Sequence, residues 1–312
     1  MVSVSSASEI SKRAKAFFQK IFPPDYFNNS TNNGNFMDAS KLDVIKQFLR
    51  TEYDSIPEKE RIGKGRLYIT KIIGKTLYNF IKINCFNLSS KEKPNPEFIE
   101  AVKKSITIMA ENPDTLRIAI QLAANLAMES FEDIIDQIQL WGTHENWEIR
   151  EDTCHLIISG LKKSKNMTLN LLKQWAKAEN ENIRRLVAES LRPRAEIKWL
   201  RDPDENDVVL EILTSLNHDS SIYVRKSVGN NLKDLTKYMP EKILNLIEDW
   251  LNNKEKLDAK GQQNLVWTIY HALRWLKAKK PEYHEKIKKL VGENYLLYYD
   301  EKKNRRALPP QQ

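Results

Sequence analysis

The sequence predicts an all-α protein built from tandem two-helix repeats. Only 9 of its 312 residues are glycine, and 41% are apolar, which is enough for a sizeable core. Apolar residues recur at spacings of three and four, the pattern of amphipathic helices. A dipeptide of an apolar residue and an arginine also returns at a regular interval. These three observations favour helices throughout the chain, arranged as an internal repeat.

The repeat is marked by four related stretches: LRIAIQLA, IREDTCHL, IRRLVAES and VRKSVGNN. Their marker arginines lie 33, 34 and 41 residues apart, at Arg117, Arg150, Arg184 and Arg225. A tryptophan follows three of these arginines after 24 or 25 residues, at Trp141, Trp175 and Trp250. Each unit therefore holds two helices, the second carrying a tryptophan for packing. This period is typical of an α-solenoid of HEAT or armadillo type, which stacks its units and leaves a concave face.

The third unit is longer than the others. Its counterpart of the tryptophan is Leu216, 32 residues after Arg184. The excess is RPRAEIKWLRDPDEN, residues 192–206. We therefore expect an insertion between the two helices of this unit.

The N-terminal third is helical in pattern but lacks the marker arginine. Its helical stretches are ASEISKRAKAFFQKIF, KLDVIKQFL and LYITKIIGKTLYNFI. We expect residues 1–111 to form a helical cap or degenerate repeats, continuous with HEAT-like repeats over residues 112–292. Asn, Ser, Gly and Pro predict loops at residues 28–35 and 89–96, and residues 293–312 read as a tail.

Composition limits the classes of partner. A net charge of +8 suits a polyanion, although charge alone also fits plain solubility. The two cysteines, Cys85 and Cys154, lack the spacing of a disulfide framework or a zinc site, and we expect neither metal nor cofactor. Because no run of ~20 apolar residues and no signal peptide is visible, we expect a cytoplasmic, nucleoid-associated bacterial protein without membrane contact. We also expect a monomer.

Helical geometry divides each repeat into two faces, since each residue advances ~100° around the axis. Counted from the marker arginine, positions −1, +3 and +7 form one arc, which we expect to be buried. The opposite arc is polar in the last three units and holds Glu151, His155, Arg185, Glu189, Arg192, Lys226, Asn230 and Lys233. In the first unit it is mainly apolar, so the polar row begins at the second.

Two interpretations of this polar arc, which is rich in arginine and lysine, stay open. It is either the solvated side of each helix, with carboxylates in salt bridges, or an inner surface where arginine and lysine meet phosphates. On the first view, Asp234 pairs with Lys233 or Lys237. On the second, carboxylates stabilise a developing positive charge. His155 beside Glu148 is not read as a metal site, since one histidine among exposed carboxylates is commonly solvated.

Two stretches, IRRLVAESLRPR and YVRKSVGNNLKDLTKYMPEKILNLIEDW, resemble the HEAT-like DNA alkylation repair glycosylases of the AlkC and AlkD type, with AlkC closer. The resemblance covers residues 113–275 and departs from the pattern at Ser190, Gly229 and Lys233. It implies a solenoid that grips duplex DNA containing alkylated bases. The implied reaction is hydrolysis of the N-glycosidic bond of bases such as 3-methyladenine, without a snug base pocket.

The resemblance also implies roles for particular residues. The catalytic carboxylates would be Asp234, Glu189 and Glu151. DNA would be bound by Arg150, Arg185, Arg192, Arg194, Arg225, Lys226, Asn230 and Lys233. Trp147 and Trp199 would contact the lesion, although a structural role fits Trp147 equally well. AlkC-type members carry a glutamate at the position that Asn146 occupies here, flanked by Glu145 and Glu148.

Three classes of function remain open on this basis. The first is a DNA glycosylase that acts on alkylated bases. The second is a relative that binds DNA without excising bases. The third is a protein–protein scaffold, a common role of HEAT arrays.

Overall fold

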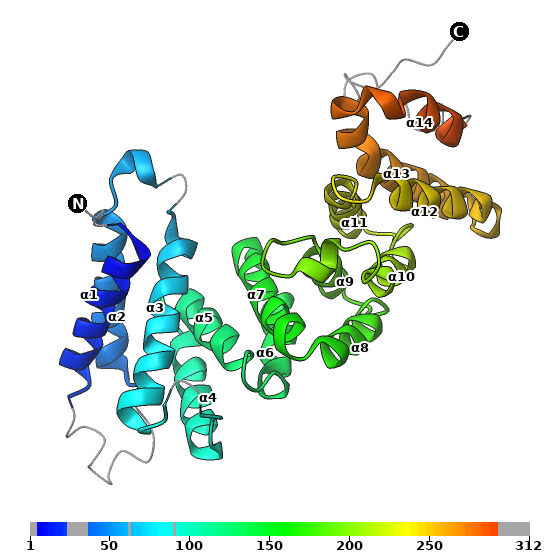
Figure 1. The fold of residues 1–312 in the computed structure, drawn as a ribbon. Coiled ribbons are helices and arrows are strands. Elements are labelled where there is room, and N and C mark those ends of the chain that lie inside the picture. Colours follow the sequence, from blue (N-terminus) through cyan, green and yellow to red (C-terminus); the bar gives the residue numbers. More distant parts are fainter. Residues whose placement is uncertain (1–4, 24–36, 62–63, 90–91, 293–312) are drawn as a thin grey trace. The chain divides into compact units, whose positions relative to one another are not determined.

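A computed structural model of the chain describes residues 5–23, 37–61, 64–89 and 92–292 (Figure 1). Apart from an isolated β-bridge between Arg194 and Ile197, the regular structure of these residues is helical. The chain divides into two compact units, residues 1–165 and 166–312. The predicted all-α, HEAT-like fold is confirmed. Among the described residues, no helix combines the length and apolar character that crossing a membrane requires.

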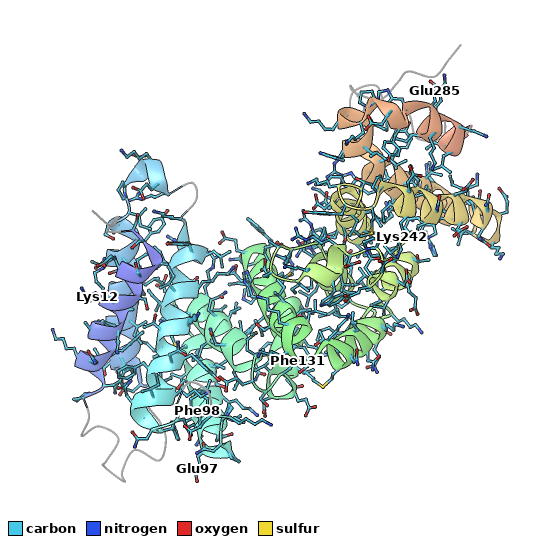
Figure 2. The ribbon with its side chains drawn as sticks, in the orientation of Figure 1. Lys12, Glu97, Phe98, Phe131, Lys242 and Glu285 are labelled. Carbon is cyan, nitrogen blue, oxygen red and sulfur yellow. The ribbon has the colours of Figure 1, made fainter. Side chains whose placement is uncertain are left out.

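The first unit contains seven α-helices within its described residues. They are α1 (Ala7–Ile21), α2 (Ala39–Asp54), α3 (Arg66–Phe80), α4 (Pro96–Ala110), α5 (Leu116–Leu126), α6 (Ile135–Gly142) and α7 (Trp147–Lys163). Short 3₁₀ turns occupy Glu58–Glu60 and Glu132–Ile134, and a π-helical segment spans Ile81–Cys85. Helix α3 packs on α1 and α5, and α5 packs on α4 and α7. Phe98 of α4, labelled in Figure 2, is fully buried. Its ring lies edge-on to those of Tyr78 and Phe86, with centroids 5.4 and 5.5 Å away.

The second unit holds the other seven α-helices of the described chain. They are α8 (Lys165–Trp175), α9 (Glu181–Ser190), α10 (Asp207–Ser215), α11 (Ile222–Leu235), α12 (Pro240–Asn252), α13 (Ala259–Lys279) and α14 (His284–Val291). Short 3₁₀ helices span Lys198–Arg201, Lys254–Lys256 and Pro281–Tyr283. Helix α11 packs between α9 and α13, and this trio of first helices carries the candidate site.

The first helix of each of the last three repeats begins in the same way. Asn146, Asn180 and Ser221 are N-caps, and each side chain accepts a hydrogen bond from the backbone N–H two residues later. Such caps satisfy amides that lack a partner at a helix start. Asn146 therefore has a structural reason to be asparagine, because a glutamate is a poorer N-cap.

The marker arginines fasten the loop before each of these helices. Nη1 of Arg150 donates to the carbonyls of residues 144 and 145, Nη1 of Arg184 to those of 178 and 179, and Nη1 of Arg225 to those of 219 and 220. Arg184 also binds Asp219 through Nε and Nη2, at 2.6 and 3.0 Å. The repeat signature in the sequence is therefore a structural device.

The predicted buried arc is confirmed in all three repeats. Its members are at most 5% exposed: Ile149, Thr153, Ile157, Ile183, Val187, Leu191, Val224, Val228 and Leu232. Trp141, Trp175 and Trp250 are also buried, as their recurrence predicts. Residues 191–206, which separate α9 from α10, contain the predicted insertion and fold into the β-bridge and one 3₁₀ helix.

The three N-terminal helical stretches are confirmed as α1, α2 and α3. The predicted loop before α4 is seen at residues 92–95. The predicted loop at 28–35 and the tail at 293–312 lie outside the described residues. The division into a cap, a repeat domain and a tail stays a prediction, as does a concave face that spans both units.

Helices α3 and α5 approach each other closely at Gly74. A Cβ atom added there would lie 2.6 Å from Cβ of Gln121 and 3.2 Å from its backbone carbon, so the helices would have to separate. We expect Gly74→Ala to lower the free energy of unfolding by about 1–3 kcal/mol, measured by urea denaturation. Gly65→Ala is the control, because its Cβ meets nothing closer than 3.8 Å; its cost should stay below about 1 kcal/mol. Equal effects would contradict the close approach.

The ion pair of Arg184 with Asp219 is largely buried, with side chains 15% and 7% exposed. Arg184→Gln removes this pair and the two loop hydrogen bonds, so we expect a loss of about 2–4 kcal/mol in the free energy of unfolding. Lys173→Gln is the matched control, since it breaks an ion pair with Glu211 whose side chains are 40% and 65% exposed. It should cost less than about 1 kcal/mol. Both losses are measured by urea denaturation. A loss for Arg184→Gln no larger than that of the control would show that the marker arginine is dispensable.

Candidate functional site

The second unit gathers a carboxylate and three cations at the C-terminal end of α11. Asp234 accepts hydrogen bonds from Nη2 and Nε of Arg192, at 2.5 and 3.2 Å. Nζ of Lys237 and Nζ of Lys233 each lie 2.9 Å from its other oxygen. The Asp234 side chain is 14% exposed, so it still reaches the surface. The salt bridges considered from the sequence are thus present, with Arg192 as an additional partner.

These contacts fix the charge of Asp234. Burial alone would raise the pKa of a carboxyl group, but hydrogen bonds from Arg192, Lys237 and Lys233 outweigh it and lower the pKa of Asp234 to about 2. The guanidinium of Arg192 has its pKa raised by Glu189 and Asp234 despite desolvation by burial. Both groups therefore stay charged across the physiological range.

Glu189 is the penultimate residue of α9 and is 3% exposed. Its Oε1 accepts from Nη1 of Arg192 at 2.6 Å, and its Oε2 lies 3.8 Å from Nη2 of Arg185. Arg192 thus bridges Glu189 and Asp234, which belong to neighbouring helices. Nδ2 of the buried Asn231 adds a direct link between α11 and α9, donating to the carbonyl of Ala188 at 3.0 Å. Glu189 is thus buried against the guanidinium groups of two arginines.

Helix α13 forms a third side of the cluster. His271 stacks on Trp267 with ring centroids 5.0 Å apart, and its Nε2 lies 3.2 Å from Oδ1 of Asn230. Arg274 donates to the same oxygen of Asn230 through Nη2. Nζ of Lys237 lies 5.9 Å above the ring of Trp275. Sequence analysis missed these α13 residues.

Two residues that the sequence analysis assigned to phosphate binding are buried. Arg185 is 8% exposed, with its guanidinium 5.0 Å above the ring of Tyr223. Arg225 is 7% exposed and lies 5.5 Å above Trp267 while it holds the loop before α11. Both use the aromatic face of the next helix in the trio, a cation–π arrangement that stabilises their charge inside the unit.

The remaining predicted residues of this unit are more accessible. Lys226 is exposed, whereas Asn230, Lys233, Arg192 and Arg194 are half-buried. Trp199 is half-buried in the 3₁₀ helix of the insertion. Lys226, Asn230 and Lys233 all lie on α11, on the arc opposite its buried stripe. The structure thus brings Glu189, Arg192, Lys233 and Asp234 into one network.

The predicted residues of the first unit occupy the start of α7. Trp147 is its first residue and is 63% exposed, and Glu151 is half-buried one turn later. The neighbouring Asp152 is 1% exposed and binds Arg117 through Nε and Nη2, at 2.6 and 3.1 Å. Burial raises the pKa of Asp152, although Arg117 opposes the shift. His155 contacts Gln121 through Nδ1 at 3.3 Å.

One signal in the sequence could have revealed the contribution of α13. Leu273 and Arg274 repeat the dipeptide of an apolar residue and arginine, but they follow Arg225 by 49 residues and so fall outside the period. Arg274 is the sixteenth residue of α13, whereas Arg150, Arg184 and Arg225 are the fourth residues of α7, α9 and α11. A search that allowed longer steps would have included the helix but not located its start.

Comparison with known proteins places this geometry in context. A family model described as DNA alkylation repair enzyme matches residues 108–287. A curated protein of Bacillus subtilis strain 168, called uncharacterized protein YhaZ, is 36% identical over 106 residues, or 33% of this chain and 27% of its own length. The match thus spans about a quarter of that relative.

Solved structures with similar folds include AlkD2 from Streptococcus mutans, with a TM-score of 0.53 and 21% identity over 75% of this chain and 98% of the other. The smu.31 protein of Streptococcus mutans UA159 has a TM-score of 0.50 and 22% identity, over 73% and 97%. The Pseudomonas fluorescens alkylpurine DNA glycosylase AlkC, bound to DNA containing an abasic site analogue, gives 0.49 and 19%, over 88% and 63%. The two likenesses to Streptococcus mutans structures agree with the HEAT-like fold.

The family model covers more than half of the sequence, including every residue of the carboxylate and cation cluster from Arg185 to Arg274. The chain belongs to the family of DNA alkylation repair enzymes.

Proposed function

We propose that this protein is a DNA glycosylase that hydrolyses the N-glycosidic bond of N-alkylated bases, such as 3-methyladenine, in duplex DNA. The observation that carries the proposal is Asp234, a carboxylate kept ionised at the edge of a cation cluster. Membership of the DNA alkylation repair family supports it. The cluster comes entirely from residues 166–312 of one chain, so the proposal needs no second subunit.

The chemistry suits a fixed negative charge. An N-alkylated purine is cationic, so it leaves readily with the electron pair of the broken C–N bond. Positive charge then develops on the sugar, as in other glycoside hydrolyses. An ionised carboxylate close to the sugar stabilises this charge. Water completes the reaction by adding at the sugar carbon and releasing a proton to solvent.

The contacts assign different roles to the two carboxylates of the cluster. Asp234 reaches the surface and would face the sugar, whereas Glu189 is buried against Arg192 and Arg185. Glu189 would act through Arg192, which it holds in place for Asp234 and for DNA. Trp199 of the insertion would contact the lesion. On the first unit, Glu151 and Trp147, which is exposed one turn before it, stay candidates in their own right for a catalytic carboxylate and a lesion contact.

Phosphate binding would rest on the accessible cations. Lys226, Lys233, Arg192 and Arg194 would meet the DNA backbone together with the amide of Asn230. Three other arginines already contact loop carbonyls or aromatic rings, namely Arg150, Arg185 and Arg225. They would contribute chiefly through their positive electrostatic potential rather than by direct contact with phosphates. Phosphates would compete with Asp234 for Lys233 and Arg192.

A second function is favoured by one observation, namely the three cations that already hold Asp234. If they remained in place on DNA, the carboxylate would be neutralised, and the protein would bind duplex DNA without excising bases. The two functions differ in base release and share DNA binding, so they can be separated by experiment.

Asp234→Asn removes the charge that would stabilise the sugar cation. We expect the single-turnover rate of base release from methylated duplex DNA to fall roughly 10²–10³-fold. DNA affinity should be retained or should rise, because the lost carboxylate no longer repels phosphate or occupies Lys233. Glu189→Gln should weaken both release and binding, since Arg192 loses a partner. Release is measured as free labelled base, and binding by fluorescence anisotropy.

Asp249→Asn on α12 serves as the control, because this acidic residue lies in the same unit outside the cluster. It should release bases at the wild-type rate. Strong DNA binding by the wild type without any base release would favour the binding protein over the enzyme.

The low pKa of Asp234 predicts a pH profile. Because the folded-state pKa lies near 2, below its ordinary value of 3.8, the carboxylate is fully ionised above about pH 4 and is lost only as pH falls toward 2. Single-turnover release between pH 5 and 8, corrected for spontaneous depurination, should therefore show no acidic limb from this group. A limb near pH 6 that disappears in Asp234→Asn would contradict the assignment.

A further inference from the structure

Helix α13 presents a positioned arginine beside the cluster. Nη1 of Arg274 donates to the carbonyl of His271 at 2.9 Å, and its Nη2 donates to Oδ1 of Asn230 on α11. The residue is exposed, yet burial of part of its side chain lowers the pKa of the guanidinium. Arg274 forms no ion pair with any carboxylate in the described part of the chain. A fixed guanidinium of this kind is suited to an anion from outside.

The position of Arg274 depends on a close contact between α11 and α13. A Cβ atom on Gly229 would lie 2.7 Å from Cδ2 and 2.8 Å from Cβ of His271, so only glycine admits the imidazole. His271 is then held between Gly229 and Trp267, with Nε2 at Asn230. Asn230 Oδ1 accepts from both His271 and Arg274, which orients the amide and the guanidinium together.

The imidazole adds no charge of its own to this arrangement. Burial and the neighbouring cations Arg274, Lys226 and Lys233 lower the pKa of His271 to about 3. It is therefore neutral over the range in which DNA binds, and as a donor to Asn230 it carries its proton on Nε2. The contact that positions Asn230 and Arg274 is thus constant with pH.

The charges around His271 are unbalanced. Lys233 and Arg192 form ion pairs with Asp234, whereas Lys226 and Arg274 form none among the residues that the structure describes, although Asp234 attracts Arg274 from a longer distance. Two cations that form no ion pair thus act on one imidazole from neighbouring helices. A phosphate diester would supply a direct anionic partner, and it matches the flat, two-pronged donor face of arginine.

We propose that Arg274 of α13 and Lys226 of α11 bind the sugar–phosphate backbone of duplex DNA, with Asn230 and His271 as positioning residues. The nature of the anion rests on the function proposed above. The assignment extends the DNA-binding surface to a helix outside the repeat period and gives Gly229 a role. Phosphate contact would occur on the side of Asp234 that faces α13.

Salt-dependent binding to undamaged duplex DNA tests the proposal. Each phosphate contact contributes about −0.9 to the slope of log Kobs against log salt concentration. Arg274→Gln and Lys226→Gln should each make the slope shallower by about 0.9, with the largest loss of affinity at low salt. Arg274→Lys should retain the slope at reduced affinity. Lys288→Gln, a change of an exposed lysine on α14, is the matched control and should leave the slope unchanged.

Gly229→Ala tests the positioning role. The added methyl group should displace His271 and with it Arg274, so this variant should lose the same part of the slope as Arg274→Gln. The double variant should lose no more than either alone. His271→Ala, which removes the imidazole without crowding, is the second test should Gly229→Ala unfold, as judged by circular dichroism. It should make the slope shallower by a similar amount.

The outcomes separate this proposal from the glycosylase. A wild-type slope in Arg274→Gln and Lys226→Gln, or no binding of duplex DNA by the wild type, would overturn the phosphate assignment. Shallower slopes in a protein that releases no methylated base would leave the assignment standing and remove the enzyme. Base release by a protein whose variants have unchanged slopes would support the glycosylase and overturn the phosphate assignment.

Discussion

The hydrogen bonds of the marker arginines are the constraint on which the repeats depend. By donating to two carbonyls of the preceding loop, Arg150, Arg184 and Arg225 fix how the chain enters the first helix of a repeat. Hydrogen bonds from a charged guanidinium to a carbonyl are stronger than those between neutral groups, so each pair holds its loop in one conformation. With the entry fixed, each first helix presents its buried arc to the core, and the opposite arc carries the polar residues. The candidate site is built on that polar arc.

The cluster around Asp234 shows how a carboxylate is kept ionised on a surface suited to DNA. An isolated carboxylate would repel phosphates, and an isolated row of cations would repel itself. Asp234 and Glu189 relieve the repulsion among Arg192, Lys233 and Lys237, while these cations lower the pKa of Asp234. Cations outnumber carboxylates in the network, so the surface keeps an attraction for polyanions. Salt bridges and a DNA-binding surface, which are alternatives at the level of sequence, coexist in one arrangement.

The helices, the buried arc and the insertion were predictable because each follows from local spacing. The fate of individual arginines was not. Arg185 and Arg225 lie beside or at the marker position, but their burial depends on Tyr223 and Trp267, aromatic residues on the next helix of the trio. Periodicity shows that a residue lies outside the buried arc of its own helix. It does not show whether an aromatic ring of another helix covers that residue. Asn146 likewise reads as a missing glutamate until the N-cap hydrogen bond to Glu148 is seen.

Gly229 connects the architecture to the chemistry. A Cβ atom added at this position would lie 2.7 Å from Cδ2 of His271. The missing methyl group lets α13 approach α11 closely enough for Asn230 to accept hydrogen bonds from both His271 and Arg274. One arginine outside the repeat period thereby joins the polar arc of α11. Helices pack closely, so a single methyl group decides whether His271 fits between α11 and α13. Its absence at Gly229 allows the guanidinium of Arg274 to lie at Asn230, near the ionised Asp234.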